Sequence, residues 1–355
     1  MIGARIQQAR NALGLSLRDV AERAEISAMA VSKYERDEIT PSSDVLLRLA
    51  RALGVRSEYF FRQQAVNLAD VNFRKHQDLP ERDRARALAD VRDQLERWLE
   101  LEQFIPTPWS KPFGLPEGLP TRIKNETEIE RAAELLRDAW GLGRNPIARL
   151  VDVLESNGIK VFSTSHVRDD KFNGLSARVE GKPLIIVGKN WPGDRQRFTL
   201  AHELGHLVLA GRLARQLDEE KACDRFAAAF LVPEERARAA LGERRTRLEP
   251  KELALLKEEW GFSMFAWAMR ARDLKILPQS RLSKLWALFK EEGWQVREPG
   301  EQYQVEETRL FDQLVFRALA EDLIGESKAA ELLGISVSQL RRTRHMGGQA
   351  DAAHQ

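Results

Sequence analysis

Two histidines and a glutamate lie within five consecutive residues, His202-Glu203-Leu204-Gly205-His206. On a helix, residues four apart face the same side, so the imidazoles of His202 and His206 can converge on one metal ion. Glu203 is turned aside from that ion, toward the attacking water. This is the H-E-x-x-H arrangement of zinc peptidases, in which the glutamate takes the proton of the water and can return it to the leaving amine. A surface helix with two solvated histidines is the alternative.

A third protein ligand is expected on the next helix, because catalytic zinc takes three protein ligands and keeps its fourth position open. Residues 218–233 have helical character, and Glu220 and Asp224 lie four apart within them. We assign Glu220 as the ligand, and Asp224 as the residue that hydrogen-bonds a ligand imidazole and fixes its tautomer. Glu219 competes with Glu220 for the role of ligand. Cys223 is the weaker competitor, because a lone cysteine beside apolar residues is more often buried.

The identity of the metal and the donor that stabilises the oxyanion remain open from the sequence. Two imidazoles and one carboxylate suit zinc, but they do not exclude manganese. Hydrolysis also needs a hydrogen-bond donor for the oxyanion that develops on the substrate. His166 and Arg197 are candidates for this transition-state donor, and an ordinary loop histidine is the competing interpretation of His166.

Three runs of sequence resemble the ImmA/IrrE metallopeptidases: RFTLAHELGH (197–206), EKACDRFAAAFLVP (220–233) and GFSMFAWAMRARDLKIL (261–277). The resemblance covers about residues 121–280. It implies a minimal gluzincin-like zinc-peptidase fold with a small sheet, and zinc on His202, His206 and Glu220. It also implies cleavage of DNA-binding repressors that control stress genes or mobile elements. Cys223 occupies a position where the family usually has alanine, which leaves the ligands unaffected.

The first 65 residues are predicted to form an all-α helix-turn-helix domain. Ser16 is suited to cap one helix, and Ala21 and Val31 have the spacing of the buried positions of the two-helix unit. Glu25 occupies the turn position where glycine is common. Residues 1–62 resemble the XRE family of repressor-like domains.

The resemblance to XRE domains implies that the second helix enters the major groove of an operator. The residues at the base-contacting positions are Ala28, Met29, Ser32 and Lys33. The two apolar residues can touch thymine methyl groups but cannot form the bidentate hydrogen bonds that read purines. A helical module that binds a protein partner is the alternative.

The remaining segments complete a multidomain, mainly α chain with an α+β core. Residues 66–120 are expected to be a helical connector, either packed on the core or dimerising, followed by a proline-rich linker. Strands are expected at 159–163 and 184–187, with a turn signal at Asn173-Gly174 between them. Residues 281–345 are expected to be helical, with a helix-turn-helix-like segment at 327–342 that serves either DNA contact or scaffolding. The tail, 346–355, is expected to be disordered.

Composition limits the classes of protein that fit. The 56 basic and 54 acidic residues nearly balance, so any DNA-binding surface must be local. No run of 18 apolar residues appears, so a membrane partner is not expected. The absence of an apolar leader and the single cysteine favour the reducing cytoplasm.

Two functions fit these observations. The first is a cytoplasmic, DNA-binding zinc endopeptidase that cleaves a repressor in a stress-response or mobile-element circuit. The second is a transcriptional repressor or antitoxin that binds its own promoter and a toxin partner, with the peptidase domain as a partner-binding or autoregulatory module. The sequence does not fix the oligomeric state, and a homodimer is compatible with it.

Overall fold

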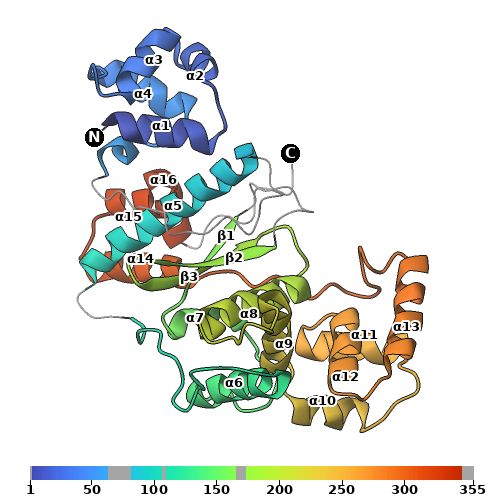
Figure 1. Cartoon of the computed structure of the whole chain (residues 1–355). Coiled ribbons are helices and arrows are strands. Elements are labelled where there is room, and N and C mark those ends of the chain that lie inside the picture. The colour runs from blue at the N-terminus through green and yellow to red at the C-terminus, as the bar shows by residue number, and fades with distance from the viewer. Residues whose placement is uncertain (1, 63–80, 106–108, 165–172, 346–355) are drawn as a thin grey trace.

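The computed structural model describes residues 2–62, 81–105, 109–164 and 173–345. Within these ranges the chain is mainly helical, with one small mixed sheet near its middle (Figure 1). This agrees with the predicted fold class. The predicted disordered tail and residues 66–80 of the predicted connector lie outside the described residues.

The N-terminal domain is a compact set of short helices around its own core. Its elements are α1 (Ile2–Ala12), α2 (Leu17–Ala24), α3 (Ala28–Glu35), α4 (Ser43–Ala52) and the 3-10 helix η1 (Ser57–Phe61). Ile6, Val20, Val31 and Leu49 are fully buried between them. Glu25 has a φ of 54° in the turn between α2 and α3, a left-handed conformation that explains the frequent glycine there.

Helix α5 (Glu81–Phe104) lies between the N-terminal domain and the sheet (Figure 1). Its apolar residues Val91, Leu95 and Trp98 are buried in a core shared with the sheet and the C-terminal helices. On the other side, Arg5 of α1 pairs with the buried carboxylate of Glu96. The helix is therefore a core-packing connector, while the predicted role in dimerisation stays a prediction.

The sheet has the strand order β1-β3-β2, with β1 (Lys160–Thr164), β2 (Gly174–Val179) and β3 (Lys182–Gly188). Strand β1 is parallel to β3 and β2 is antiparallel to it. The turn that joins β2 to β3 is Glu180-Gly181, where both residues have positive φ (51° and 78°), as a tight hairpin requires. The prediction of a turn at Asn173-Gly174 was wrong, since Gly174 begins β2.

Strand β2 was not predicted because its sequence, GLSARV, contains few β-branched or aromatic residues. It forms because β3 supplies a full antiparallel partner. The strand lies along α8, which makes it one wall of the site described below.

Helices cover both faces of the sheet (Figure 1). One face packs on a core shared by helices that follow β3 and by two that precede β1: α6 (Glu126–Ala139), α7 (Leu150–Ser156), α8 (Gly193–Leu209), α9 (Glu219–Leu231), α10 (Glu234–Leu241), α11 (Pro250–Trp260), α12 (Met264–Asp273) and α13 (Gln279–Glu291). The other face packs on α5 and on α14 (Leu310–Ala320), α15 (Glu326–Leu333) and α16 (Val337–Arg344). No helix in the described ranges is long and apolar enough to cross a membrane.

Candidate metal centre

Helix α8 positions the H-E-x-x-H residues. It is anchored by a buried apolar side that includes Leu200, Leu204 and Val208. This packing turns His202 and His206 toward α9, where both side chains are half-buried at the floor of a cavity of about 1000 Å³. Glycine at 205 allows α9 to pack closely, because a Cβ there would lie only 3.2–3.3 Å from Phe226 and Cys223.

Three ligand atoms of the predicted set face one another. The Nε2 atoms of His202 and His206 are 3.1 Å apart, and Oε2 of Glu220 lies 3.2 Å from the first and 3.6 Å from the second. A tetrahedral zinc with bonds of about 2.0–2.2 Å would separate its ligands by about 3.3–3.6 Å. The donor types and their spacing therefore fit a zinc ion.

The other ring nitrogens of both histidines contact carboxylates. Nδ1 of His202 lies 2.8 Å from Oδ1 of Asp224, and Nδ1 of His206 lies 3.0 Å from Oε1 of Glu219. Such contacts place the ring proton on Nδ1 and leave Nε2 free to bind a metal. The structure thus places Asp224 where the sequence suggested.

Neither competitor of Glu220 lies on the metal side of the histidines. Glu219 contacts Nδ1 of His206 instead of joining the three facing ligand atoms. Cys223 is fully buried, with its Sγ 3.3 Å from the same Nδ1. Sequence reasoning missed Glu219 as an orienting residue, because a residue thirteen positions after His206 on another helix has no periodic relation to it.

The carboxylates also favour positive charge at this site. Burial alone would lower the pKa of His202, but the hydrogen bond to Asp224 and the charges of Glu203, Asp224 and Glu220 outweigh burial and raise the pKa. An environment that stabilises an imidazolium in the metal-free chain also favours a divalent cation, which would compete with that proton.

Asp224→Asn is expected to weaken metal binding by about 10–100-fold. The neutral amide is a weaker acceptor than the carboxylate for the N–H of His202, so it orients the imidazole less well. Asp218→Asn is the matched control. Asp218 caps the same helix through the backbone of Lys221, and asparagine caps as well as aspartate. A competition titration against a chromophoric chelator measures both affinities. Equal affinities for the two variants would show that Asp224 does not orient the ligand.

Glu203 is held against β2. Its Oε2 accepts a hydrogen bond of 2.8 Å from the hydroxyl of Ser176, and its side chain is buried. A Cβ on Gly174 would lie 2.4 Å from Cγ2 of Thr199 and 3.3 Å from Cγ of Glu203, so only glycine permits this close approach of strand and helix. Sequence reasoning missed Ser176 and Gly174, because both act across elements far apart in the chain.

A second cavity, of about 1100 Å³, lies next to the first. Phe198 and Asp224 line both. Its walls carry large apolar side chains from α12, α13 and the segments before α8 and after α13, including Trp191, Phe265, Trp286 and Trp294. The second cavity therefore borders the one that holds the three ligand atoms.

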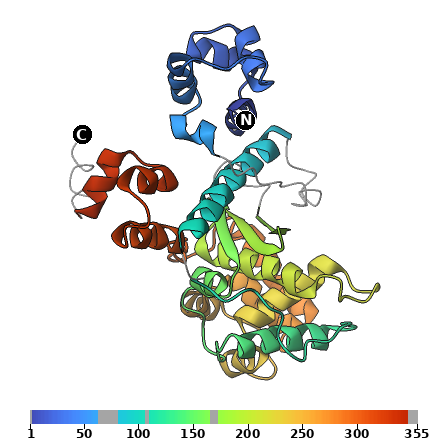
Figure 2. The same cartoon turned by 90° about the vertical axis from the view of Figure 1, so that its left-hand side faces the viewer.

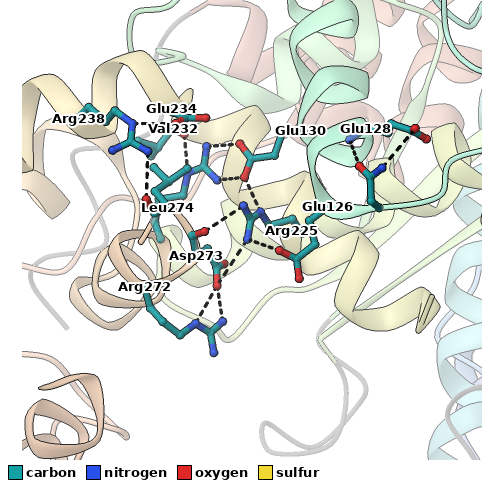
Figure 3. A network of polar contacts seen from close by, with 12 residues as sticks. Glu126, Glu128, Glu130, Arg225, Val232, Glu234, Arg238, Arg272, Asp273 and Leu274 are labelled. Carbon is teal, nitrogen blue, oxygen red and sulfur yellow. Dashed lines mark hydrogen bonds and ion pairs between the residues drawn. The ribbon is translucent and has the colours of Figure 1, made fainter. Parts of the chain in front are cut away.

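A network of charged residues fixes α9 in place (Figure 3). Arg270 of α12 donates two hydrogen bonds to Glu130 of α6, at 2.6 and 2.7 Å. Arg225, the residue after Asp224, pairs with the same carboxylate and donates to the backbone of Asp273. Burial alone would raise the pKa of Glu130, but the two guanidinium groups outweigh it and hold that pKa below its ordinary value. The ligand helix is thereby tied to α6 and α12.

The two predicted hydrogen-bond donors for the transition state are His166 and Arg197. His166 lies outside the described residues. Arg197 is buried, pairs with Glu306 and donates to the carbonyl of Ile147 at 2.7 Å. It is not among the residues that line the cavity at His202. The structure therefore argues against Arg197 as the donor, because its hydrogen bonds hold distant segments of the chain together.

The four predicted DNA-contacting residues lie in the first two turns of α3, after the cap Ser27. Met29 is 69% exposed, and the other three, Ala28, Ser32 and Lys33, are partly exposed. All four belong to α3, which lies at the outer side of the N-terminal domain, away from α8 and α9 (Figure 1).

Comparison with known families identifies two parts of the chain. Residues 154–272 match the family described as IrrE N-terminal-like domain, Peptidase_M78. Residues 6–60 match the family described as Helix-turn-helix, HTH_3. The chain therefore carries an IrrE N-terminal-like domain behind an N-terminal helix-turn-helix domain, a type of domain that binds DNA.

Individual relatives are distant. The HTH-type transcriptional regulator ImmR of Bacillus subtilis (strain 168) is 32% identical over 66 residues, which are 19% of this chain and 52% of the relative. The match thus spans about half the length of that relative. Two solved structures of ComR from S. thermophilus, one apo and one with DNA and the signalling peptide ComS, align over 96% and 98% of this chain and 94% and 96% of theirs, with 14% and 15% identity and TM-scores of 0.17 and 0.19. Scores this low do not establish a common fold.

Proposed function

We propose that the chain is a DNA-binding regulatory zinc endopeptidase, with His202, His206 and Glu220 as metal ligands and Glu203 as general base. The observation that carries this proposal is the triangle of ligand atoms, with sides of 3.1, 3.2 and 3.6 Å, beside a buried glutamate in a cavity lined by β2, α8 and α9. The match of residues 154–272 to a peptidase family supports it.

The residues around the triangle have distinct tasks in this proposal. Bound zinc supplies a Lewis acid that polarises the scissile carbonyl and activates water near neutral pH. Glu203 takes a proton from the attacking water and delivers it to the leaving nitrogen. Ser176, by donating to Oε2 of Glu203, fixes the carboxylate and leaves Oε1 for the proton. Asp224 and Glu219 keep both imidazoles in the tautomer that binds metal.

The cleft suits an extended segment of a protein substrate. Strand β2 is an edge strand of the sheet and lines the cavity with Leu175, Ser176 and Ala177. An extended peptide can pair with such an edge through its backbone, which gives affinity with little dependence on sequence. Side chains further along the substrate would then enter the aromatic cavity, which supports selection of few substrates.

The helix-turn-helix domain supports a DNA-bound repressor as the substrate. Tethering a peptidase to a DNA-binding domain raises its effective concentration beside other proteins bound to the same DNA, without any new contact in the cleft. A stress-response or mobile-element circuit is the proposed setting, by resemblance to the ImmA/IrrE metallopeptidases.

The proposed peptidase function is tested by identifying the protein N-termini that cleavage creates in cells. Cells that produce the wild-type chain should contain new N-termini, from one or a few DNA-binding proteins, that are absent from cells producing Glu203→Gln. If the variant gives the same N-termini and regulates the same genes, the peptidase function fails. The repressor or antitoxin function, favoured by the similarity to a transcriptional regulator, would then stand.

A further inference from the structure

The C-terminal helices α15 and α16 repeat the geometry of the DNA-binding unit α2 and α3 at a constant offset of 309 residues, which pairs Ala21 with Ala330. In the first unit the N–H of Ile26 donates to the carbonyl of Ala21 at 2.9 Å, and in the second Ile335 donates to Ala330 at 3.0 Å. The residue before each isoleucine is left-handed: Glu25 has a φ of 54° and Gly334 a φ of 69°. The match of residues 6–60 to a helix-turn-helix family does not extend to this second unit.

The caps and buried positions also correspond. Ser27 and Ser336 each cap the second helix of their unit by accepting from a backbone N–H three residues later, at 3.1 Å in both. Val31 and Leu340, which correspond at the same offset, are both fully buried. Two segments with the same turn, cap and core position present the same face of their second helix outward.

The outward residues of α16 are better suited to DNA than those of α3. The positions equivalent to Ala28, Met29, Ser32 and Lys33 are Val337, Ser338, Arg341 and Arg342. Arginine forms bidentate hydrogen bonds with guanine and with phosphate, which neither alanine nor methionine can do. Helix α16 carries three arginines and no acidic residue.

These arginines are available to a ligand. Arg341 and Arg344 pair with Glu326 at 2.8 and 2.7 Å, but their side chains are 65% and 44% exposed. Exposed pairs of this kind add little to stability, so a phosphate can replace the carboxylate. Among the described residues, no carboxylate lies within ion-pair distance of Arg342, which is also exposed.

The scaffolding role falls mainly to α15. Glu331 of α15 pairs with Arg62, and the carbonyl of Leu332 accepts from Arg97 of α5 at 3.0 Å. On α16, only Leu340 is buried. Figure 2 shows the C-terminal helices, in dark red, standing out from the side of the molecule. Among them, α15 contacts the end of the N-terminal domain through Glu331 and Arg62.

We propose that α16 is a second DNA-contacting helix, with Arg341 and Arg342 on phosphates or guanine edges and Ser338 beside them. The chain would then hold DNA at two places, through α3 and through α16. This inference does not depend on the peptidase function, because none of these residues belongs to the metal centre.

The test is the affinity of the full chain for a mixed-sequence 30-base-pair DNA duplex, measured by fluorescence anisotropy over a series of salt concentrations. Arg342→Glu is expected to weaken binding by about tenfold at 0.1 M salt and to reduce the slope of log Kd against log salt by about one. Arg281→Glu on α13 is the control. It makes the same change of charge at an exposed site far from α16 (Figure 1) and should change Kd by less than about twofold.

Three results would overturn the proposal. If Arg342→Glu binds the duplex like the wild type, α16 does not contact DNA. A change of oligomeric state in sedimentation velocity with DNA affinity intact would instead make α16 a protein-binding surface. If Arg281→Glu weakens binding as much as Arg342→Glu, only net charge matters and the proposal also fails. Ser338→Glu, which leaves every arginine in place, checks the same surface and should weaken binding in the same direction.

Discussion

Glu203→Gln is expected to lower the rate of substrate cleavage by about 10²–10⁴-fold while leaving the metal bound. The amide has the size of the carboxylate but cannot take a proton from water. Its carbonyl oxygen can still accept the hydrogen bond of Ser176, so the side chain should keep its place against β2. The measurement is the cleavage rate of a purified substrate protein found by its new N-terminus, with the metal content of each preparation determined alongside.

Glu180→Gln is the matched control for this variant. Glu180 lines the same cavity, but it lies in the hairpin turn after β2 and makes no contact with the metal ligands. Its replacement removes the same charge from the cleft and should change the rate by less than about threefold, as a screened surface charge does. Near-wild-type cleavage by Glu203→Gln would exclude Glu203 as general base. Loss of the metal from that variant would indicate a ligand role instead.

The two adjacent glutamates of α9 should differ sharply in their effect on metal affinity. Glu220→Gln removes the anionic member of the proposed ligand set. The loss of metal affinity should therefore exceed the 10–100-fold expected for an outer hydrogen-bond partner. Glu219→Gln should lower the metal affinity by about tenfold or less, because the amide oxygen of glutamine can still accept a hydrogen bond from Nδ1 of His206. Titration of both variants with zinc against a chromophoric chelator gives the two affinities.

This comparison has a built-in control, since both substitutions make the same chemical change in neighbouring residues of the first turn of one helix. Differences in folding or net charge therefore largely cancel. The reverse order of affinities would identify Glu219 as the ligand and would contradict the orientation of His206 described above. Equal losses would mean that neither carboxylate has the assigned role.

Local spacing was enough to predict much of the candidate centre. The histidines four apart on α8 and the Glu220–Asp224 pair on α9 are periodic features of single helices, and helical periodicity places side chains on one face without knowledge of the fold. The same holds for the cap of α2 and the turn between α2 and α3, which depend on residues within a few positions of one another.

Features that depend on packing between distant segments were not predictable in this way. Ser176 meets Glu203 only because β2 pairs with β3 and lies along α8. Arg197 lies five residues before His202, yet its guanidinium contacts Glu306 and the carbonyl of Ile147, which are more than a hundred and fifty residues apart from each other. Sequence spacing carries no information about such partners.

The proposed metal centre is tested by the number of metal ions that the purified full chain binds after incubation with zinc and removal of excess metal. Elemental analysis should find about one ion per chain in the wild type, and His202→Ala and His206→Ala should lose it, because catalytic zinc needs three protein ligands. A wild-type chain with no bound divalent metal under these conditions, with zinc and then with manganese, would contradict the proposed metal centre.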